Sequence, residues 1–347
     1  MSAPRRCPDV PHNAWYAAAT VEEVGRTPLA RRALGHRLAL YRTTDGRAVA
    51  LEDRCAHKPV PLSAGRVVGD DLVAAYTGFR YGPDGRCTAV PTQDNVPYGA
   101  RVHAYPVHED GTFVWVWPGE PRLAPLRRPP SAPWLQDSEW VTFGDAWDTK
   151  ASIRLMQDNF SDITHVAMVD PEIAPPALGA GPPPPLEVRV SETTMSFSRS
   201  YPPAPVAPWH AQLLGLPADA QHLHREEGEF TSPGLWVDRW LVTVEGHGKA
   251  DGEHGFVFTH ALTPVDETTT RHVWRVSRNF ATSPAATGTA SALLRGYYLK
   301  VRGALETMQE MVDTDGLRDE VSLASDDAAS QVRRIMDQLV AEETGVR

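Results

Sequence analysis

Two residues in the first third of the chain could bind a metal ion. Cys55 and His57 are separated by one residue, and thiolate and imidazole groups are common ligands of transition metals. A simpler interpretation is that Cys55 is a small buried apolar residue, which is the commoner fate of a free cysteine, and that His57 only bonds to the backbone. The spacing alone leaves both interpretations open.

A second group of polar residues follows in the middle of the chain. Composition predicts a helix over 156–169, and Asp170-Pro171 should end it because proline disfavours continuation of a helix. Three polar side chains recur on this helix at three-residue spacing and should share one face: Asn159, Asp162 and His165. If that face lines a cavity, these groups are candidates for acid–base chemistry. An equally good explanation for these three residues is that they contribute only to packing.

The region around Cys55 resembles the Rieske domain of ring-hydroxylating and demethylating oxygenases. The resemblance covers residues 52–91. In that family a Cys-x-His pair and a later Cys-x-x-His pair share four ligands between the two irons of a [2Fe–2S] cluster. Cys55 and His57 match the first pair, but Ala74 and Thr77 occupy the positions of the second cysteine and histidine. Each iron would lose one ligand, so we interpret Cys55 and His57 as vestigial and expect no cluster.

The second half of the chain resembles the catalytic domain of the same family. The matching passages are 158–165, 260–280 and 325–343. The family motif Asn-x-x-Asp-x-x-His-x-x-x-x-His supplies two histidines, and an aspartate on the C-terminal helix completes a 2-His-1-carboxylate site for iron. The first three motif residues are present here, but Asp170 replaces the second histidine and Val301 stands at the carboxylate position. The resemblance therefore implies that this chain has no metal site.

The alternative to a complete loss of metal binding is a metal site with unusual ligands. The C-terminal helix aligns loosely, so Glu306 or Glu310 could replace the missing carboxylate. His165 and Asp170 could also join one of several other donors, of which the candidates are Glu306, His260, His222 and His224. Such a set would bind some divalent ion. It would receive no electrons through a cluster, however, because the Rieske-like domain lacks two cluster ligands.

Length, charge and cysteine content exclude several classes of protein. A chain of 347 residues can form two domains, each with its own core. A net charge of −10 and a pI near 5.7 argue against a nucleic-acid partner. The three cysteines form no disulfide framework, and neither a signal sequence nor a membrane span is evident. We expect a cytoplasmic protein with no membrane partner, and the family resemblance implies a homotrimer.

We therefore expect an α+β protein with two domains. Residues 1–118 should form an all-β Rieske-like domain, 119–133 a proline-rich linker, and 134–347 a helix-grip domain of the START or Bet v1 type. The last of these should have a curved antiparallel sheet and a long C-terminal helix. The expected strands are 186–200, 234–245, 254–263 and 268–280, and the expected helices are about 290–314 and 326–343.

Three functions fit these expectations. The first is a cofactor-free cyclisation or pericyclic step, such as a [4+2] cycloaddition, on an apolar polyketide-like intermediate of secondary metabolism, including antibiotic biosynthesis. Its candidate catalytic residues are His165, Asp170, Asp162 and Asn159. The second is a non-catalytic accessory subunit of an intact oxygenase. The third is an authentic monooxygenase with unusual ligands. We rank the first highest because polar motif residues remain where redox ligands were replaced.

A close pairing of His165 with Asp170 is part of the cyclase hypothesis. The two residues stand at the two histidine positions of the family motif, where both side chains should point into the cavity. A carboxylate at close range would raise the pKa of the imidazole. The resulting imidazolium could polarise a substrate carbonyl.

Overall fold

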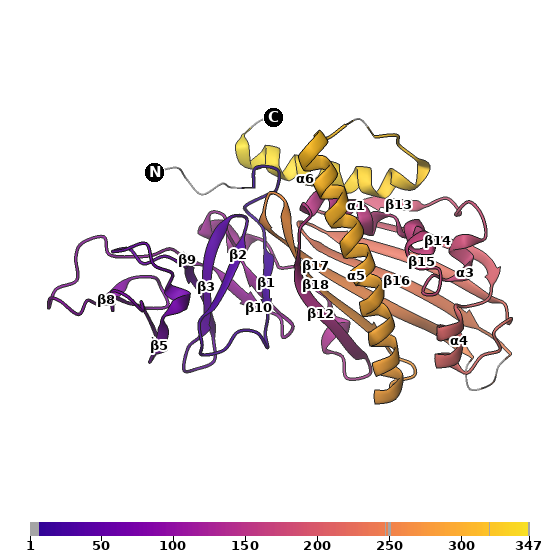
Figure 1. Ribbon diagram of the computed structural model, residues 1–347, viewed down its shortest axis with the longest axis horizontal. Helices are drawn as coiled ribbons and strands as arrows, with labels where there is room; N and C mark the ends of the chain where they lie inside the picture. The colour runs from indigo at the N-terminus through magenta and orange to yellow at the C-terminus, as the bar shows by residue number, and fades with distance from the viewer. Residues whose placement is uncertain (1–6, 247, 249–250, 319, 346–347) are drawn as a thin grey trace. The chain divides into compact units, whose positions relative to one another are not determined.

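The computed structural model describes residues 7–246, 248, 251–318 and 320–345, and it divides into two compact units (Figure 1). The first unit comprises Met1–Ser131 together with Thr263–Glu267 and Val340–Arg347. The second comprises Ala132–Leu262 and Thr268–Leu339. The predicted boundaries at 118 and 133 stay a prediction, and the first six residues of the predicted Rieske-like domain lie outside the described part of the chain.

The first unit is built from three small antiparallel sheets. One has the order β2-β3-β4-β9 and another the order β1-β11-β10. The strands of these two sheets are β1 (Tyr16–Thr20), β2 (Leu29–Ala33), β3 (His36–Arg42), β4 (Ala48–Glu52), β9 (Ala104–Tyr105), β10 (Val107–Glu109) and β11 (Phe113–Val116). β3 and β4 pair through consecutive buried apolar residues, and Gly46 adopts the left-handed φ of +87° that their connecting turn requires.

The third sheet of this unit, with the order β5-β6-β7-β8, carries the region that resembles a cluster-binding domain. Its strands are β5 (Arg66–Val68), β6 (Asp71–Val73), β7 (Arg80–Tyr81) and β8 (Cys87–Ala89). Cys55 lies in the loop after β4, and Thr77 lies in the turn between β6 and β7. The Asp53 carboxylate holds the first loop by accepting hydrogen bonds from the Ser63 backbone N–H and hydroxyl at 2.6 and 2.7 Å.

The second unit is dominated by one antiparallel sheet of seven strands. Its order is β12-β18-β17-β16-β15-β14-β13. The strands are β12 (Val141–Thr149), β13 (Glu187–Val190), β14 (Thr194–Ala204), β15 (His222–Thr231), β16 (Leu235–Val244), β17 (Gly252–Asp266) and β18 (Thr269–Arg278). The long helix α5 (Pro284–Asp315) crosses this sheet (Figure 1) and buries Leu294, Tyr298, Val301 and Leu305. A further helix, α6 (Asp327–Thr344), follows it.

The helix predicted over 156–169 is interrupted. The structure has α1 (Ile153–Ser161), a single turn at Ile163–His165 and α2 (Val166–Val169). Asp162 has extended backbone angles, and its side chain caps the following turn by accepting from the Thr164 N–H at 2.9 Å. This capping replaces the helical hydrogen bond. The expectation of one continuous helical face is therefore wrong.

Short helical segments fill the rest of the second unit. They are α3 (Pro176–Gly179) and α4 (Pro208–Leu214), each beginning at a proline. The region predicted as a proline-rich linker contains a 3₁₀ segment at Pro121–Leu126, and a second one begins at Pro133. Among the described residues, no helix has the length and apolar character needed to cross a membrane.

Candidate active site

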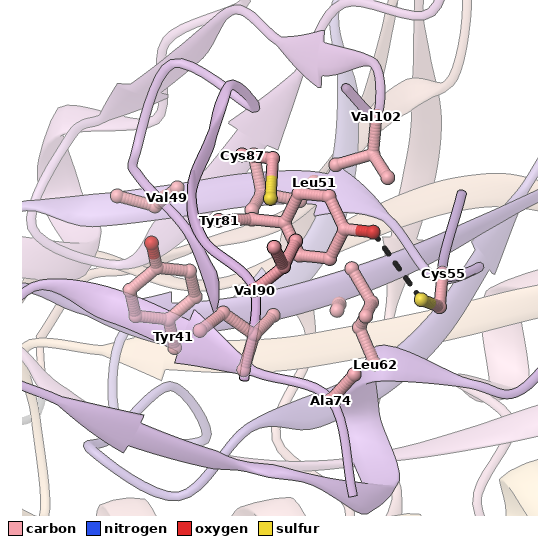
Figure 2. Close-up of a cluster of buried hydrophobic side chains, with 12 residues drawn as sticks. Tyr41, Val49, Leu51, Cys55, Leu62, Ala74, Tyr81, Cys87, Val90 and Val102 are labelled. Atoms are coloured by element: carbon pink, nitrogen blue, oxygen red, sulfur yellow. Dashed lines mark hydrogen bonds between the residues drawn. The ribbon is translucent and has the colours of Figure 1, made fainter. Parts of the chain in front are cut away.

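The Cys55 thiol is buried and hydrogen-bonded in the first unit. Its Sγ lies 3.2 Å from the Thr77 hydroxyl. It also lies 3.2 Å from the Tyr81 hydroxyl (Figure 2). Burial raises the pKa of this thiol, but the hydrogen bonds from Thr77 and Tyr81 outweigh burial and bring the pKa below its ordinary value. Ala74 and Tyr81 are buried in the same apolar cluster as Cys55. The sulfur is therefore part of a packed core that includes polar groups.

The other half of the vestigial pair lies at the surface. His57 is exposed and stacks on Phe79, with ring centroids 5.1 Å apart and an interplanar angle of 22°. Cys55 and His57 thus occupy different environments. The prediction that Cys55 behaves as a small buried residue agrees with its position, although hydrogen bonds from two hydroxyl groups to its sulfur were not foreseen.

In the second unit, the interruption after α1 positions His165. Its Nδ1 lies 2.7 Å from the Asp162 carbonyl oxygen, and its Nε2 lies 3.2 Å from the Tyr297 hydroxyl. A carbonyl oxygen can only accept, so Nδ1 carries the proton. Burial lowers the pKa of His165 more than the neighbouring Asp162 raises it. In the neutral imidazole Nε2 is an acceptor, and Tyr297 donates to it.

Asp170 has a different partner from the one predicted. Its buried carboxylate Oδ2 lies 2.7 Å from Lys300 Nζ on α5. Asp170 does not join the residues that line the cavity described below. The predicted pairing with His165 and the predicted imidazolium are both wrong, because Lys300 binds Asp170 and burial favours the neutral form of His165. The proposed catalytic roles of His165, Asp170, Asp162 and Asn159 stay predictions.

A mostly apolar cavity lies between the sheet and the helices of the second unit. Asn159 and His165 line it, as predicted for these two side chains, and Trp209 and Trp240 contribute aromatic walls. Sequence reasoning missed several polar lining residues: Glu226, Asp238, Tyr297 and Tyr298. Glu226 and Asp238 lie on different strands, and Tyr297 and Tyr298 lie on the distant helix α5, so only the packing of these elements brings the four residues together.

One buried ionic network stabilises the edge of this cavity. Glu226 accepts hydrogen bonds from Arg199 Nε at 2.6 Å and from the Tyr201 hydroxyl at 2.7 Å. Arg199 also lies 3.9 Å from Asp162. Every charge in this network has a partner, as burial requires. The network connects β14 and β15 to the turn that carries His165, so we assign it a structural role.

Three of the other metal donors considered from the sequence have partners other than His165. Glu306 accepts from the Lys150 backbone N–H at 3.1 Å and from Arg302 Nε at 2.9 Å. His224 bonds to the Ala204 carbonyl at 2.9 Å, and His260 lies 3.0 Å from His272. Among the residues that the structure describes, no group of three or more His, Cys, Asp and Glu side chains is arranged to hold a metal ion.

Two family models match this chain and together cover most of it. Residues 14–106 match the Rieske [2Fe-2S] domain, and residues 149–342 match the vanillate O-demethylase oxygenase C-terminal domain. The chain belongs to the Rieske oxygenase alpha-subunit family. The resemblance seen in the sequence is confirmed, and so is the expected fold of a Rieske β domain followed by a curved antiparallel sheet with a C-terminal helix.

Similar members of the Rieske oxygenase family are oxygenase components. The oxygenase subunit of a vanillate O-demethylase from a Pseudomonas species is 30% identical over 96% of each chain. The oxygenase component of dicamba O-demethylase from Stenotrophomonas maltophilia is 30% identical and covers 94% of this chain and 97% of its own length. A crystal structure of dicamba monooxygenase bound to 3,6-dichlorosalicylic acid has a TM-score of 0.86, with 28% identity over 96% and 98% of the chains.

These comparisons favour an enzyme that acts on a small molecule. They give no support to a cyclase, and they favour the oxygenase alternative over the cyclase hypothesis. Neither the accessory-subunit hypothesis nor the predicted homotrimer is shown by them.

The residues in the first unit do not fit a [2Fe–2S] cluster. In a Rieske centre, two thiolates bind one iron and two imidazoles bind the other. Cys55 and Thr77 occupy positions that would ligate different irons, yet their side chains are in direct contact at 3.2 Å. Ala74 is buried and supplies no donor atom. The available donors are too few, and the sulfur already has hydroxyl partners.

The residues in the second unit do not fit a 2-His-1-carboxylate iron site either. Asp170 stands at the position of the second histidine, and Lys300 brings an ammonium group to 2.7 Å from it. The next residue on α5 is Val301, at the position of the family carboxylate, and it is buried and apolar. Asp170 is already neutralised by Lys300, and Val301 has no donor atom. Both features disfavour binding of a divalent cation here.

Proposed function

We propose that this chain is a member of the Rieske oxygenase family that works without either metal centre. It binds a mostly apolar small molecule in the cavity of the second unit and converts it without dioxygen. The observation that carries the proposal is the ion pair between Lys300 and Asp170, which stands at the second histidine position of the family motif. The loss of two cluster ligands at Ala74 and Thr77 supports it independently.

An isomerising cyclisation or pericyclic step is the reaction class that these residues support best. Such a reaction needs a shaped pocket that folds a flexible substrate into a reactive conformer. The aromatic walls at Trp209 and Trp240 supply shape. The Tyr297 hydroxyl, held by His165 Nε2 at 3.2 Å, supplies a fixed polar group at one end. Because its proton is directed to His165, the Tyr297 oxygen can accept a hydrogen bond from a substrate O–H or N–H and so orient the substrate.

Oxygenase activity is the second candidate, and the comparisons favour it. The similar proteins named above are oxygenase components, and the match extends over both domains. For this function, the present chain would have to receive electrons without the second pair of cluster ligands. Its iron would also need ligands other than Asp170, which is bound to Lys300.

Isotope labelling separates the two candidates. The strain that carries the gene is compared with its deletion mutant, and an extract of the mutant is incubated with the purified protein under nitrogen with EDTA. We expect a compound that accumulates in the mutant to be converted to an isomer of equal mass. Conversion that requires air and places ¹⁸O from labelled dioxygen in the product would overturn the proposal. An Ala substitution at His165 serves as the matched inactive protein.

The accessory-subunit hypothesis and the predicted homotrimer are tested by the same preparation. If the protein acts alone, the isolated chain converts the compound without an oxygenase partner. Analytical ultracentrifugation of that preparation measures the oligomeric state, for which we predict three subunits. A requirement for a second protein in the conversion would favour the accessory role.

A further inference from the structure

A buried carboxyl group faces the cavity opposite the elements that carry His165. Side chains alternate between the two faces of a strand, so residues 236, 238 and 240 of β16 share one face. Asp238 and Trp240 both line the cavity, as does His260 on the neighbouring strand β17. The inference that follows rests on the proposed function, because it names the chemical group by which that cavity recognises its ligand.

The two oxygens of the Asp238 carboxyl group have different surroundings. Oδ1 accepts a hydrogen bond from Trp236 Nε1 at 2.8 Å. Oδ2 lies 3.9 Å from His260 Nε2, which is too long for a hydrogen bond. The side chain keeps 10% of its surface exposed, although the residue lies within the sheet. Trp236 thus fixes the orientation of the carboxyl group while Oδ2 stays available to a ligand.

The surroundings of Asp238 favour the neutral acid. Burial raises the pKa of Asp238 well above its ordinary value, and the hydrogen bond from Trp236 lowers it by less. Burial also lowers the pKa of His260 well below its ordinary value and that of its partner His272 to about 3, so neither imidazole supplies a positive charge at neutral pH. Within the described ranges, no Arg or Lys forms an ion pair with Asp238.

We propose that Asp238 donates a hydrogen bond from its carboxyl O–H to a carbonyl oxygen of an otherwise apolar ligand. Oδ2 is the available oxygen, and the aromatic and aliphatic walls accept the remainder of the molecule. A hydrogen bond to a carbonyl oxygen withdraws electron density from the conjugated carbons, which favours cyclisation of a polyene or enone. The ligand class is therefore an apolar molecule with a ketone, ester or lactone carbonyl.

The test uses two probes of nearly equal shape. 2-Acetylnaphthalene carries a carbonyl group, and 2-ethylnaphthalene does not. Their dissociation constants are measured by tryptophan fluorescence for the wild-type protein and for Asp238→Leu. The ratio of the two constants is compared between proteins, so that differences in hydration of the probes cancel. We expect the preference for the ketone to fall about tenfold in Asp238→Leu, which corresponds to about one hydrogen bond.

Two further variants keep the result interpretable. Asp238→Asn retains an acceptor for Trp236 and gains an N–H donor, so it is expected to keep most of the preference for the ketone. Asp148→Leu, which changes an exposed carboxylate of the same sheet, is the matched control and should bind both probes like wild type. Circular dichroism establishes that each variant is folded.

Infrared spectroscopy tests the protonated carboxyl group without any ligand. The carbonyl-stretch band of a neutral carboxylic acid at pH 7 should be present in wild type and lost in Asp238→Asn. An unchanged probe preference in folded Asp238→Leu, failure of both probes to bind, or absence of the infrared band would each overturn the inference. These readouts involve no turnover, so they are distinguishable from a failure of the proposed function, which isotope labelling reveals.

Discussion

Lys300 and Asp170 form an ion pair, with 2.7 Å between Nζ and Oδ2, and Asp170 stands where the family motif has its second histidine. The carboxylate is buried, whereas the lysine side chain is 56% exposed. A buried carboxylate needs a partner, and here a cation carried by α5 is that partner. Lys300 therefore neutralises Asp170, and the ion pair connects the end of α2 to α5.

Removal of the lysine charge should destabilise the second unit. Lys300→Met leaves Asp170 buried without a partner, and we expect the free energy of unfolding to fall by about 1–2 kcal/mol, less than for a fully buried pair because Lys300 is half exposed. Urea unfolding measures this. Lys150→Met, which alters an exposed lysine, is the matched control. Equal stability of Lys300→Met and wild type would show that the ion pair is dispensable.

Substitutions at His165 and Tyr297 should reduce turnover of the substrate found by the isotope experiment. We expect His165→Ala to lower kcat by about ten- to a thousandfold because Tyr297 then loses the partner that orients its hydroxyl toward the substrate, and Tyr297→Phe to have a similar effect. Asp170→His restores a family residue but should not create an oxygenase, because Lys300 and Val301 are unchanged. A normal kcat in both His165→Ala and Tyr297→Phe would mean that catalysis depends on the shape of the cavity and not on these two side chains.

Buried neutral histidines should make the protein sensitive to acid. Burial lowers the pKa of His210 and of His272 to about 3, whereas the unfolded chain binds the proton near pH 6.5. Between these values the unfolded state binds more protons, so stability is full above about pH 6.5 and falls as the pH decreases toward about 3.

The same pH range provides a test at one residue. His210 is packed among aromatic rings including Trp209, Phe256 and Phe280. We expect His210→Phe to be as stable as wild type or more stable at pH 8. Below pH 6, its free energy of unfolding should fall by about 1.4 kcal/mol less per pH unit than that of wild type. Urea unfolding at a series of pH values measures the slope. An unchanged slope would mean that His210 is protonated in the native state.

Replacement of the vestigial cysteine should have a modest effect. Cys55→Ser keeps a group that can bond to Thr77 and Tyr81, but it places a hydroxyl in an apolar cluster. We expect a loss of about 1–2 kcal/mol in the free energy of unfolding and turnover close to that of wild type. Loss of activity in folded Cys55→Ser protein would instead assign a function to the remaining half of the cluster site.

The sequence was sufficient for the family and the fold, because motif order and local periodicity do not depend on distant contacts. β12 and β15 were not predicted: His222–Thr231 is rich in charged and polar residues, and its alternation of buried and more exposed side chains follows only from its neighbours in the sheet. The pairing of Asp170 was predicted wrongly for a related reason. Lys300 is 130 residues away, and only the packing of α5 brings it to the carboxylate. Asp238 was missed because its significance depends on burial.

Iron and acid-labile sulfide in anaerobically purified protein test the central claim most directly. The wild-type protein, after reconstitution with iron and sulfide, should contain no stoichiometric iron or sulfide and show no cluster absorption. The double variant Ala74→Cys with Thr77→His restores four ligands of the right types and is expected to acquire a cluster under the same conditions. Stoichiometric iron and sulfide in the wild-type protein would contradict the account.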